Sequence, residues 1–292
     1  MHLPDALTLL QAAVSGLLVG ALFALAALGL SLVVGVVRIV NLMHGELVLL
    51  GAYAAFGLVQ ATGLNPLLVA PLAALVVALL GWPVERFLLQ PVVRHGEEAP
   101  LLTTFALSVI IQNLLVFLVG ADTRSIDSGL GARRLELGGV SVPLVYLAGF
   151  VVALAVCAAV HLLISRSAFG RRIRASAENP LDAAVVGVPV RRLYALTFML
   201  AAGVSGLGGA LLAMVFAFTP NSGVEYLLTG FTVVVLGGLG SVVGTLVGGL
   251  ALGLVESLAA AFLGDGYRLF VGLVAFLVFL ALRPQGLFGR RA

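Results

Sequence analysis

The stretch GLSLVVGVVRIVNLMHGELVLLGAY, residues 29–53, joins two long apolar runs through a short polar cluster. The first run ends at Val37 and the second begins at Leu47. Between two membrane-length segments, irregular backbone and polar side chains are tolerated only where protein buries them or a wet cavity receives them. The stretch therefore predicts a helix break that serves a transport path or a docking element. The residues of this break are Arg38, Asn41, His44, Gly45 and Glu46.

The composition of the whole chain points to lipid as its solvent. Hydrophobic residues make up 61% and charged residues 10% of the 292 residues, and the mean hydropathy is +1.19. Soluble domains average roughly half apolar and about a quarter charged residues, so a soluble core of this size would not hide the apolar surface. We therefore expect an all-α polytopic membrane protein in which residues 1–292 form a single integral membrane domain.

Several apolar runs are candidate membrane helices, because a span needs about 20 mostly apolar residues. Two runs, Leu47–Gln60 and Leu227–Leu239, fall short of that length. Each of these is either half of a broken helix or a re-entrant piece, so we expect about eight or nine transmembrane helices. The longer runs are Val14–Val37, Pro66–Leu89, Leu101–Val119, Pro143–Ile164, Leu193–Phe218, Val242–Leu263 and Leu269–Leu282.

Arginine placement sets the expected orientation, because cytoplasmic connections are enriched in Lys and Arg. We place the segment 165–192 and the C-terminal tail in the cytoplasm and the loop 120–142 and the N-terminus outside, which requires the short runs to cross as well. The net charge of +3 does not indicate a nucleic-acid partner, since the arginines lie between apolar runs. The arginines expected in the cytoplasm are Arg38, Arg94, Arg166, Arg171, Arg172, Arg174, Arg191, Arg192, Arg283, Arg290 and Arg291.

The cytoplasmic segment 165–192, SRSAFGRRIRASAENPLDAAVVGVPVRR, reads as structured. Residues 171–177 are compatible with a helix. Asn179 suits the N-cap of a second short helix that begins at Pro180 and ends at Gly187. One face of that helix would be apolar and suited to pack on a partner domain; the alternative is a plain loop whose arginines bind anionic lipid. The residues of that face are Leu181, Ala184 and Val185.

Four stretches together resemble a known family along nearly the whole chain: ALAALGLSLVVGVVRIVNLMHGELVLLGAY, FGRRIRASAENPLDAAVVGVPVRRLYALTF, GGLGSVVGTLVGGLALGLVES and RPQGLFGR. The chain is similar to the integral membrane permeases of branched-chain (hydrophobic) amino-acid ABC importers. In that family two permease subunits form the pore, two cytoplasmic ATPases drive it, and an extracytoplasmic binding protein delivers the substrate.

The resemblance also implies that the segment 165–192 couples the permease to an ATPase. The segment departs from the fuller EAA-type loop of other importers, since Glu178, Asn179 and Pro180 precede the small residues. The residues implied in coupling are Arg171, Arg172, Glu178, Leu181, Ala183, Ala184 and Gly187.

Polar side chains within the predicted spans are candidates for a translocation path. Thr104, Ser108 and Gln112 recur every four residues, so they share a helix face. They either bond their own helix and its neighbours or face a pore. Glu256 is an intramembrane carboxylate and therefore functional by default; it either faces a subunit interface or bonds a serine or backbone group.

Two breaks add further candidates to this path. The cluster with Asn41, His44 and Glu46 either lines the path or is a satisfied interfacial loop, in which Glu46 stabilises the next helix N-terminus. The glycine spacing in 237–253 predicts close helix packing. A second break opens this stretch, and paired breaks can mark a substrate route. Its residues are Gly237, Gly238 and Gly240.

The sequence carries no GxxxxGK[ST], HExxH or GxSxG motif, so we expect neither an enzyme nor a metal site, and ATP bound only by partner subunits. The expected function is import of branched-chain or related apolar amino acids across a bacterial or archaeal plasma membrane, with the C-terminus cytoplasmic. An importer of urea or short amides, an ion-coupled secondary transporter and a membrane-embedded enzyme remain alternatives. The second permease subunit is either a copy of this chain or a different one.

Overall fold

The computed structural model of the chain describes residues 5–93, 95–96, 98–283 and 286–288. The expected cytoplasmic arginines Arg94, Arg290 and Arg291 lie outside the described residues. Helices dominate, in the order α1 Ala6–Leu32, α2 His44–Thr62, α3 Pro66–Pro83, α4 Gln90–Val93, α5 Glu98–Val119, α6 Leu144–Arg166, α7 Ala168–Glu178, α8 Pro180–Val185, α9 Val190–Leu212, α10 Gly223–Gly237, α11 Val242–Leu263 and α12 Arg268–Leu282.

The predicted fold class is confirmed. Within the described residues, 8 helices are long and apolar enough to cross a membrane, and α10 is a shorter apolar helix. Two of the candidate spans are continued by π-helical turns. Val33–Val37 extends α1, and Val84–Leu89 joins α3 to α4. The short run predicted at Leu47–Gln60 belongs to a full-length helix, because α2 extends it at both ends.

Several predicted helix boundaries are wrong. The run predicted at Leu227–Leu239 is the helix α10, which begins at Gly223 and ends at Gly237. α1 begins at Ala6 and not at Val14, because the Asp5 side chain caps it by accepting from the Thr8 N–H at 2.9 Å. α2 begins at His44 and not at Leu47. α9 ends at Leu212 and not at Phe218, since the following residues turn and pair with the loop after α5.

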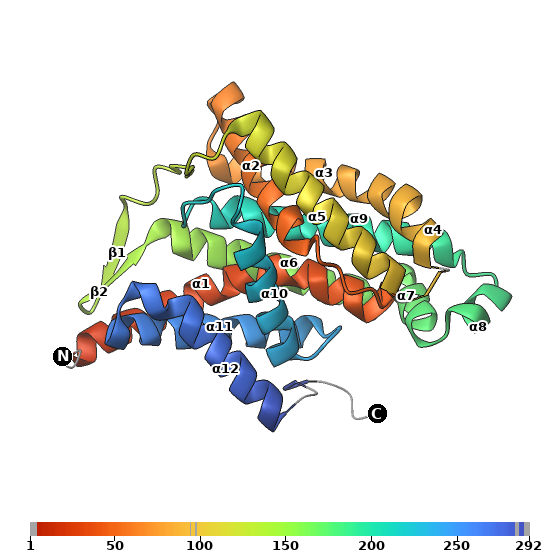
Figure 1. Cartoon of the computed structure of the whole chain (residues 1–292). Coiled ribbons are helices and arrows are strands. Elements are labelled where there is room, and N and C mark those ends of the chain that lie inside the picture. Colours follow the sequence, from red (N-terminus) through yellow and green to blue (C-terminus); the bar gives the residue numbers. More distant parts are fainter. Residues whose placement is uncertain (1–4, 94, 97, 284–285, 289–292) are drawn as a thin grey trace.

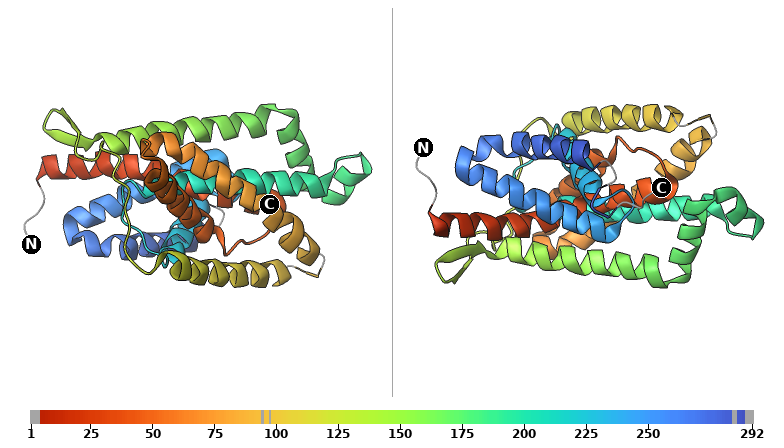
Figure 2. Two further views of the ribbon diagram at one scale, coloured as in Figure 1. Left: turned by 90° about the horizontal axis from the view of Figure 1, so that it is seen from above. Right: turned by 90° about the horizontal axis from the view of Figure 1, so that it is seen from below.

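The helices pack into one bundle with two distinct ends (Figures 1 and 2). The start of α1 and a β-hairpin lie at one end, and α7 and α8 project from the other. The hairpin pairs β1 Arg134–Leu137 with β2 Val140–Pro143 in antiparallel register. Gln11 of α1 fixes it by bonding the Ser141 backbone in both directions, at 2.6 and 2.7 Å.

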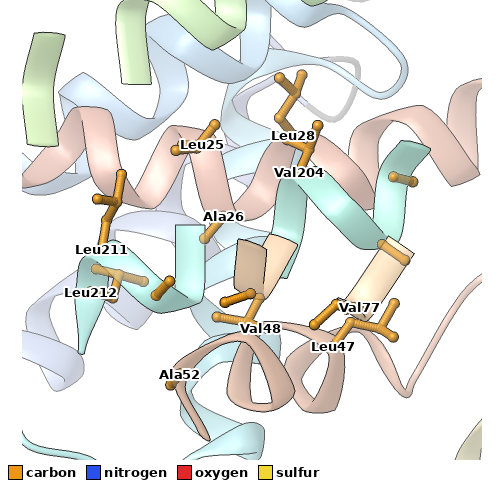
Figure 3. Packing of buried hydrophobic residues seen from close by; sticks show 14 of the residues in the cluster. Leu25, Ala26, Leu28, Leu47, Val48, Ala52, Val77, Val204, Leu211 and Leu212 are labelled. Carbon is orange, nitrogen blue, oxygen red and sulfur yellow. The ribbon is translucent and has the colours of Figure 1, made fainter. Parts of the chain in front are cut away.

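α1 lies at the centre of the bundle and packs on α6, α9 and α11. Glycines allow a close approach of α1 and α11: a Cβ added at Gly253 of α11 would lie 2.5 Å from Gly20 Cα of α1. The predicted close packing of the glycine-rich stretch is thereby confirmed. A second apolar contact joins α1, α2, α3 and α9 (Figure 3). Its labelled side chains include Leu25, Leu28, Leu47, Val48, Val77, Val204 and Leu211.

Candidate functional site

The predicted break after Val37 exists, and it is tighter than expected. Arg38 adopts a left-handed conformation with φ 58°, which is uncommon for a residue with a Cβ. The Asn41 side-chain oxygen then accepts from the Met43 N–H at 3.1 Å, a local turn typical of asparagine. α2 starts at once, so His44, Gly45 and Glu46, which were predicted as part of the break, form its first helical turn.

The first turn of α2 packs against α10, which is far away in the sequence. A Cβ added at Gly45 would overlap the Gly223 carbonyl oxygen, and one added at Gly223 would overlap the Glu46 carboxylate. The Glu46 carboxylate, 2% exposed, therefore sits beside the first residue of α10. A helix N-terminus favours negative charge through its unpaired N–H groups and its dipole. His44 is buried against Gly230, further along α10.

The polar stripe of α5 runs along one edge of this contact. Thr104 Oγ1 accepts from the Leu42 N–H at 3.2 Å, and Ser108 Oγ donates to Glu46 Oε1 at 3.2 Å. Gln112 Nε2 donates to Asn221 Oδ1, before α10, at 2.9 Å. All three members thus bond the break or the segment leading into α10, so the stripe ties α5 to the other two elements.

Several polar atoms at this junction are buried without an internal partner. Within the described part of the chain, nothing hydrogen-bonds to Asn41 Nδ2, His44 Nε2 or Glu46 Oε2. Burying a polar group unpaired costs roughly 1–3 kcal/mol, and such groups are rare unless a ligand or water satisfies them. The junction of α2, α5 and α10 is therefore the candidate site; it offers an amide donor, an imidazole nitrogen and a carboxylate oxygen.

The second break lies at the other end of α10. Gly238 and Gly240 take positive φ angles of 101° and 78°, and Ser241 Oγ caps α11 by accepting from the Gly244 N–H at 3.0 Å. Gly240 lies against Gly35, in the π-helical turn before the first break. The two breaks are thus neighbours in space, although nothing in the sequence shows the contact itself.

Residues of the C-terminal tail complete this second break. The Leu287 and Phe288 N–H groups donate to the carbonyl oxygens of Leu236 and Gly237, at 3.0 and 3.1 Å. They satisfy carbonyl groups at the end of α10 that the helix itself leaves unpaired. From the sequence, the tail was a stretch of family resemblance and a cytoplasmic segment, and its contact with α10 was not predicted.

Glu256 does not join these clusters. It lies twelve residues beyond Gly244 on α11, which is about 18 Å along a helix. Its carboxylate lies against Gly272 of α12 and faces a cavity that Arg268 also lines. The serine or backbone bond considered from the sequence is not formed among the described residues. Arg268 was missed because it comes from a different helix.

The segment 165–192 forms the two predicted short helices, α7 and α8. Asn179 caps α8, since its side-chain oxygen accepts from the Leu181 and Asp182 N–H groups at 3.0 and 3.3 Å. Gly187 ends the motif with φ 83°. Leu181 and Val185 are 77% and 86% exposed, an unusual state for large apolar side chains on the surface of a helical hairpin. The exposed residues also include Arg171, Arg172, Glu178, Ala184 and Val186.

Ala183 differs from the other residues implied in coupling. It is buried on the opposite face of α8, so it anchors the helix to its own chain and offers no surface to a partner.

Comparison with known proteins gives consistent matches over the full length. The family described as the permease component of the branched-chain amino acid transport system matches residues 12–282. The high-affinity branched-chain amino acid transport permease BraD of Pseudomonas aeruginosa is 32% identical over 99% of this chain and 98% of its own length. The permease LivH of Escherichia coli K12 is 30% identical over 96% of both chains.

A more distant relative matches only part of the chain. The ribose import permease RbsC of Bacillus subtilis is 29% identical over 56% of this chain and 53% of its own length. No solved structure matches the chain.

Proposed function

This chain belongs to the family of branched-chain amino acid transport permease components, and from that membership we propose that it imports branched-chain or closely related apolar amino acids. It is a permease subunit of an importer. The main support for this substrate assignment is the match to BraD and LivH over nearly the whole chain. Urea or short amides as substrates, ion-coupled secondary transport and enzymatic activity gain no support from these relatives.

ATP hydrolysis is assigned to separate cytoplasmic ATPase subunits that bind ATP and dock on α7 and α8. The support is the exposed apolar pair Leu181 and Val185 on α8, together with the exposed Arg171 and Arg172 on the preceding helix α7. Large apolar side chains held in water on a capped, rigid helix are typical of a surface that a partner covers. A second permease subunit and an extracytoplasmic binding protein complete the assembly.

The substrate path is assigned to the junction of α2, α5 and α10. Gln112, Ser108 and Thr104 lie along one edge of it, and Asn41, His44 and Glu46 contribute the unpaired polar atoms. The break at Gly237, Gly238 and Gly240 separates α10 from α11 at the far end of α10. A tilt of α10 would move both ends of this path together, since α10 contacts both breaks.

The protein is assigned to the plasma membrane with its N-terminus outside and α7, α8 and the C-terminal end of α12 in the cytoplasm. The positive-inside rule supports this orientation, because the arginines concentrate around α7 and α8. The separation of the hairpin from α7 and α8, at opposite ends of the bundle, supports it as well (Figure 2).

The coupling assignment is tested with Leu181→Asp and Val185→Asp together, and with Leu64→Asp as the control at an exposed apolar position on the loop after α2. The double variant is expected to lose co-purification with the ATPase subunits and vanadate-sensitive leucine uptake in vesicles, while Leu64→Asp keeps both. Wild-type levels of ATPase binding and uptake in the double variant would refute docking on α8.

A further inference from the structure

A cavity of about 190 Å³ opens at the end of the bundle that carries the hairpin. Its walls come from the N-terminal half of α1, the hairpin, the start of α6, the C-terminal half of α11 and the start of α12. It lies apart from the junction of α2, α5 and α10. Pockets for drug-sized ligands measure about 300–1,000 Å³, so this cavity fits a molecule of amino-acid size.

Charges of both signs line this one cavity. Glu256 contributes a carboxylate on a side chain that is only 9% exposed. Arg134 of the hairpin and Arg268 of α12 contribute guanidinium groups. Arg268 Nε forms an ion pair with Asp265 Oδ1 at 2.9 Å, although the angles do not allow a hydrogen bond. This ion pair restrains the Arg268 side chain at the cavity wall.

The Glu256 carboxylate has no internal partner of its own. Among the described residues, neither an ion pair nor a hydrogen bond is formed by this carboxylate, although Arg268 lines the same cavity. Glu256 Oε1 lies against Gly272 of α12, where a side chain would collide with it, and Glu256 also lines the cavity. A carboxylate buried this deeply in a membrane helix is costly unless something pairs with it. A cation or a hydrogen-bond donor bound in the cavity would therefore stabilise the Glu256 carboxylate.

The remaining lining includes both polar and apolar side chains. The Gln11 side chain already hydrogen-bonds to the hairpin, because its Nε2 donates to the Ser141 carbonyl oxygen and its Oε1 accepts from the Ser141 N–H. Ser257 stands beside Glu256 at the polar end. The apolar part consists of Val19, Phe23 and Tyr146.

We propose that this cavity binds a small zwitterion, with its ammonium group on Glu256, its anionic group toward Arg268 and Arg134, and any apolar portion against Val19, Phe23 and Tyr146. Two sources share this chemistry: a free α-amino acid, and the headgroup of an ethanolamine phospholipid. With a free amino acid the cavity is a receiving site at the outer end of the permease. That version rests on the proposed function, whereas the headgroup version does not.

The test uses the purified complex of permease and ATPase subunits in phosphatidylcholine nanodiscs, without the external binding protein. Equilibrium binding of radiolabelled L-leucine is measured in competition with isoamylamine, which lacks the carboxylate, and 4-methylpentanoate, which lacks the ammonium. Leucine is expected to bind, and each analogue to compete about tenfold more weakly or worse, because each leaves one charge of the site unpaired.

Charge-removing variants locate the site. Glu256→Gln and Arg268→Gln are expected to weaken leucine binding about tenfold or more, whereas Glu225→Gln, at an exposed carboxylate of α10, leaves it unchanged. A second arm exchanges the lipid for labelled phosphatidylethanolamine and measures the amount retained after detergent washing. Retention that falls in Glu256→Gln, without leucine binding in wild type, identifies the source as a lipid headgroup.

A labelling experiment keeps the proposal falsifiable if the charge variants fail to fold. Cys157 is buried, so Ser15→Cys in a Cys157→Ala background places a reactive thiol at the cavity wall. Leucine or phosphatidylethanolamine is expected to slow its reaction with a membrane-impermeant maleimide. The zwitterion site is refuted if neither ligand protects this thiol. Uptake driven by the external binding protein, measured in the same preparation, reports separately on the proposed function.

Discussion

The contact between α1 and α11 depends on Gly249, and the Gly249→Ala change tests it. A Cβ at this position would lie 2.6 Å from Ala24 Cβ and 2.6 Å from the Gly20 carbonyl oxygen, whereas ordinary contact begins near 3.4 Å. The two helices must therefore separate by about 0.8 Å locally. A gap of that size forfeits roughly a quarter to a half of the dispersion energy of the atom pairs it affects.

Overpacking of this kind costs typically about 1–3 kcal/mol, and the better helix propensity of alanine returns roughly 0.5–1 kcal/mol. Gly249→Ala is therefore expected to lower the free energy of unfolding by about 1–2 kcal/mol. Gly57→Ala is the matched control, because a Cβ at Gly57, also within a membrane helix, meets nothing within 4 Å. It should be neutral or slightly stabilising.

Reversible unfolding of the purified protein in mixed micelles, titrated with a denaturing detergent, gives both free energies. Gly249→Leu, which adds a larger side chain at the same place, should unfold at a still lower detergent fraction. Equal stability of Gly249→Ala and Gly57→Ala would show that α1 and α11 do not approach as closely as the structure has them.

Three further changes test other contacts. Ser108→Ala leaves both oxygen atoms of the Glu46 carboxylate without a partner and should cost about 1–3 kcal/mol; detergent unfolding measures the loss, and a stability equal to wild type would argue against the bond. Asn179→Ala removes the cap of α8 and should destabilise that helix by about 1 kcal/mol; faster amide exchange confined to α8 is the expected signature, and unchanged exchange would contradict the cap. Leu287→Pro removes the N–H group that donates to the Leu236 carbonyl and should lower the melting temperature, whereas Leu287→Ala keeps the donor; equal melting temperatures would show that the tail contributes nothing.

Local sequence patterns predicted most of the helices. Lipid imposes a length and a composition on each span, and both are properties of a continuous stretch, so the centres of the spans are found correctly. The motif from Asn179 to Gly187 was predicted for a similar reason, since its cap, proline and glycine act on their own backbone neighbours. The boundaries at Ala6 and His44 were missed because capping by Asp5 and packing on α10 extend those helices past their apolar cores.

The candidate site was predicted as separate pieces. The sequence showed that Thr104, Ser108 and Gln112 share a helix face, and it left open whether they bond neighbouring helices or face a pore. The structure shows that they bond neighbouring segments, namely the break, the start of α2 and the segment before α10. Their place on a substrate path stays a prediction. Glu256 was singled out as well, but its neighbour Arg268 was not, because residues on different helices carry no mutual spacing signal.

By itself, the sequence determined that lipid is the solvent, which stretches are long and apolar enough to cross it, where the chain breaks, and that a capped basic segment separates α6 from α9. These features follow from hydropathy, charge and turn chemistry, which act over one or two helical turns. Only the tertiary structure decided that Glu46 lies beside the start of α10, that the two breaks are neighbours in space, and that charges of both signs line the cavity near the hairpin. Such contacts join residues distant in the chain, and the close approach of glycine backbones sets them.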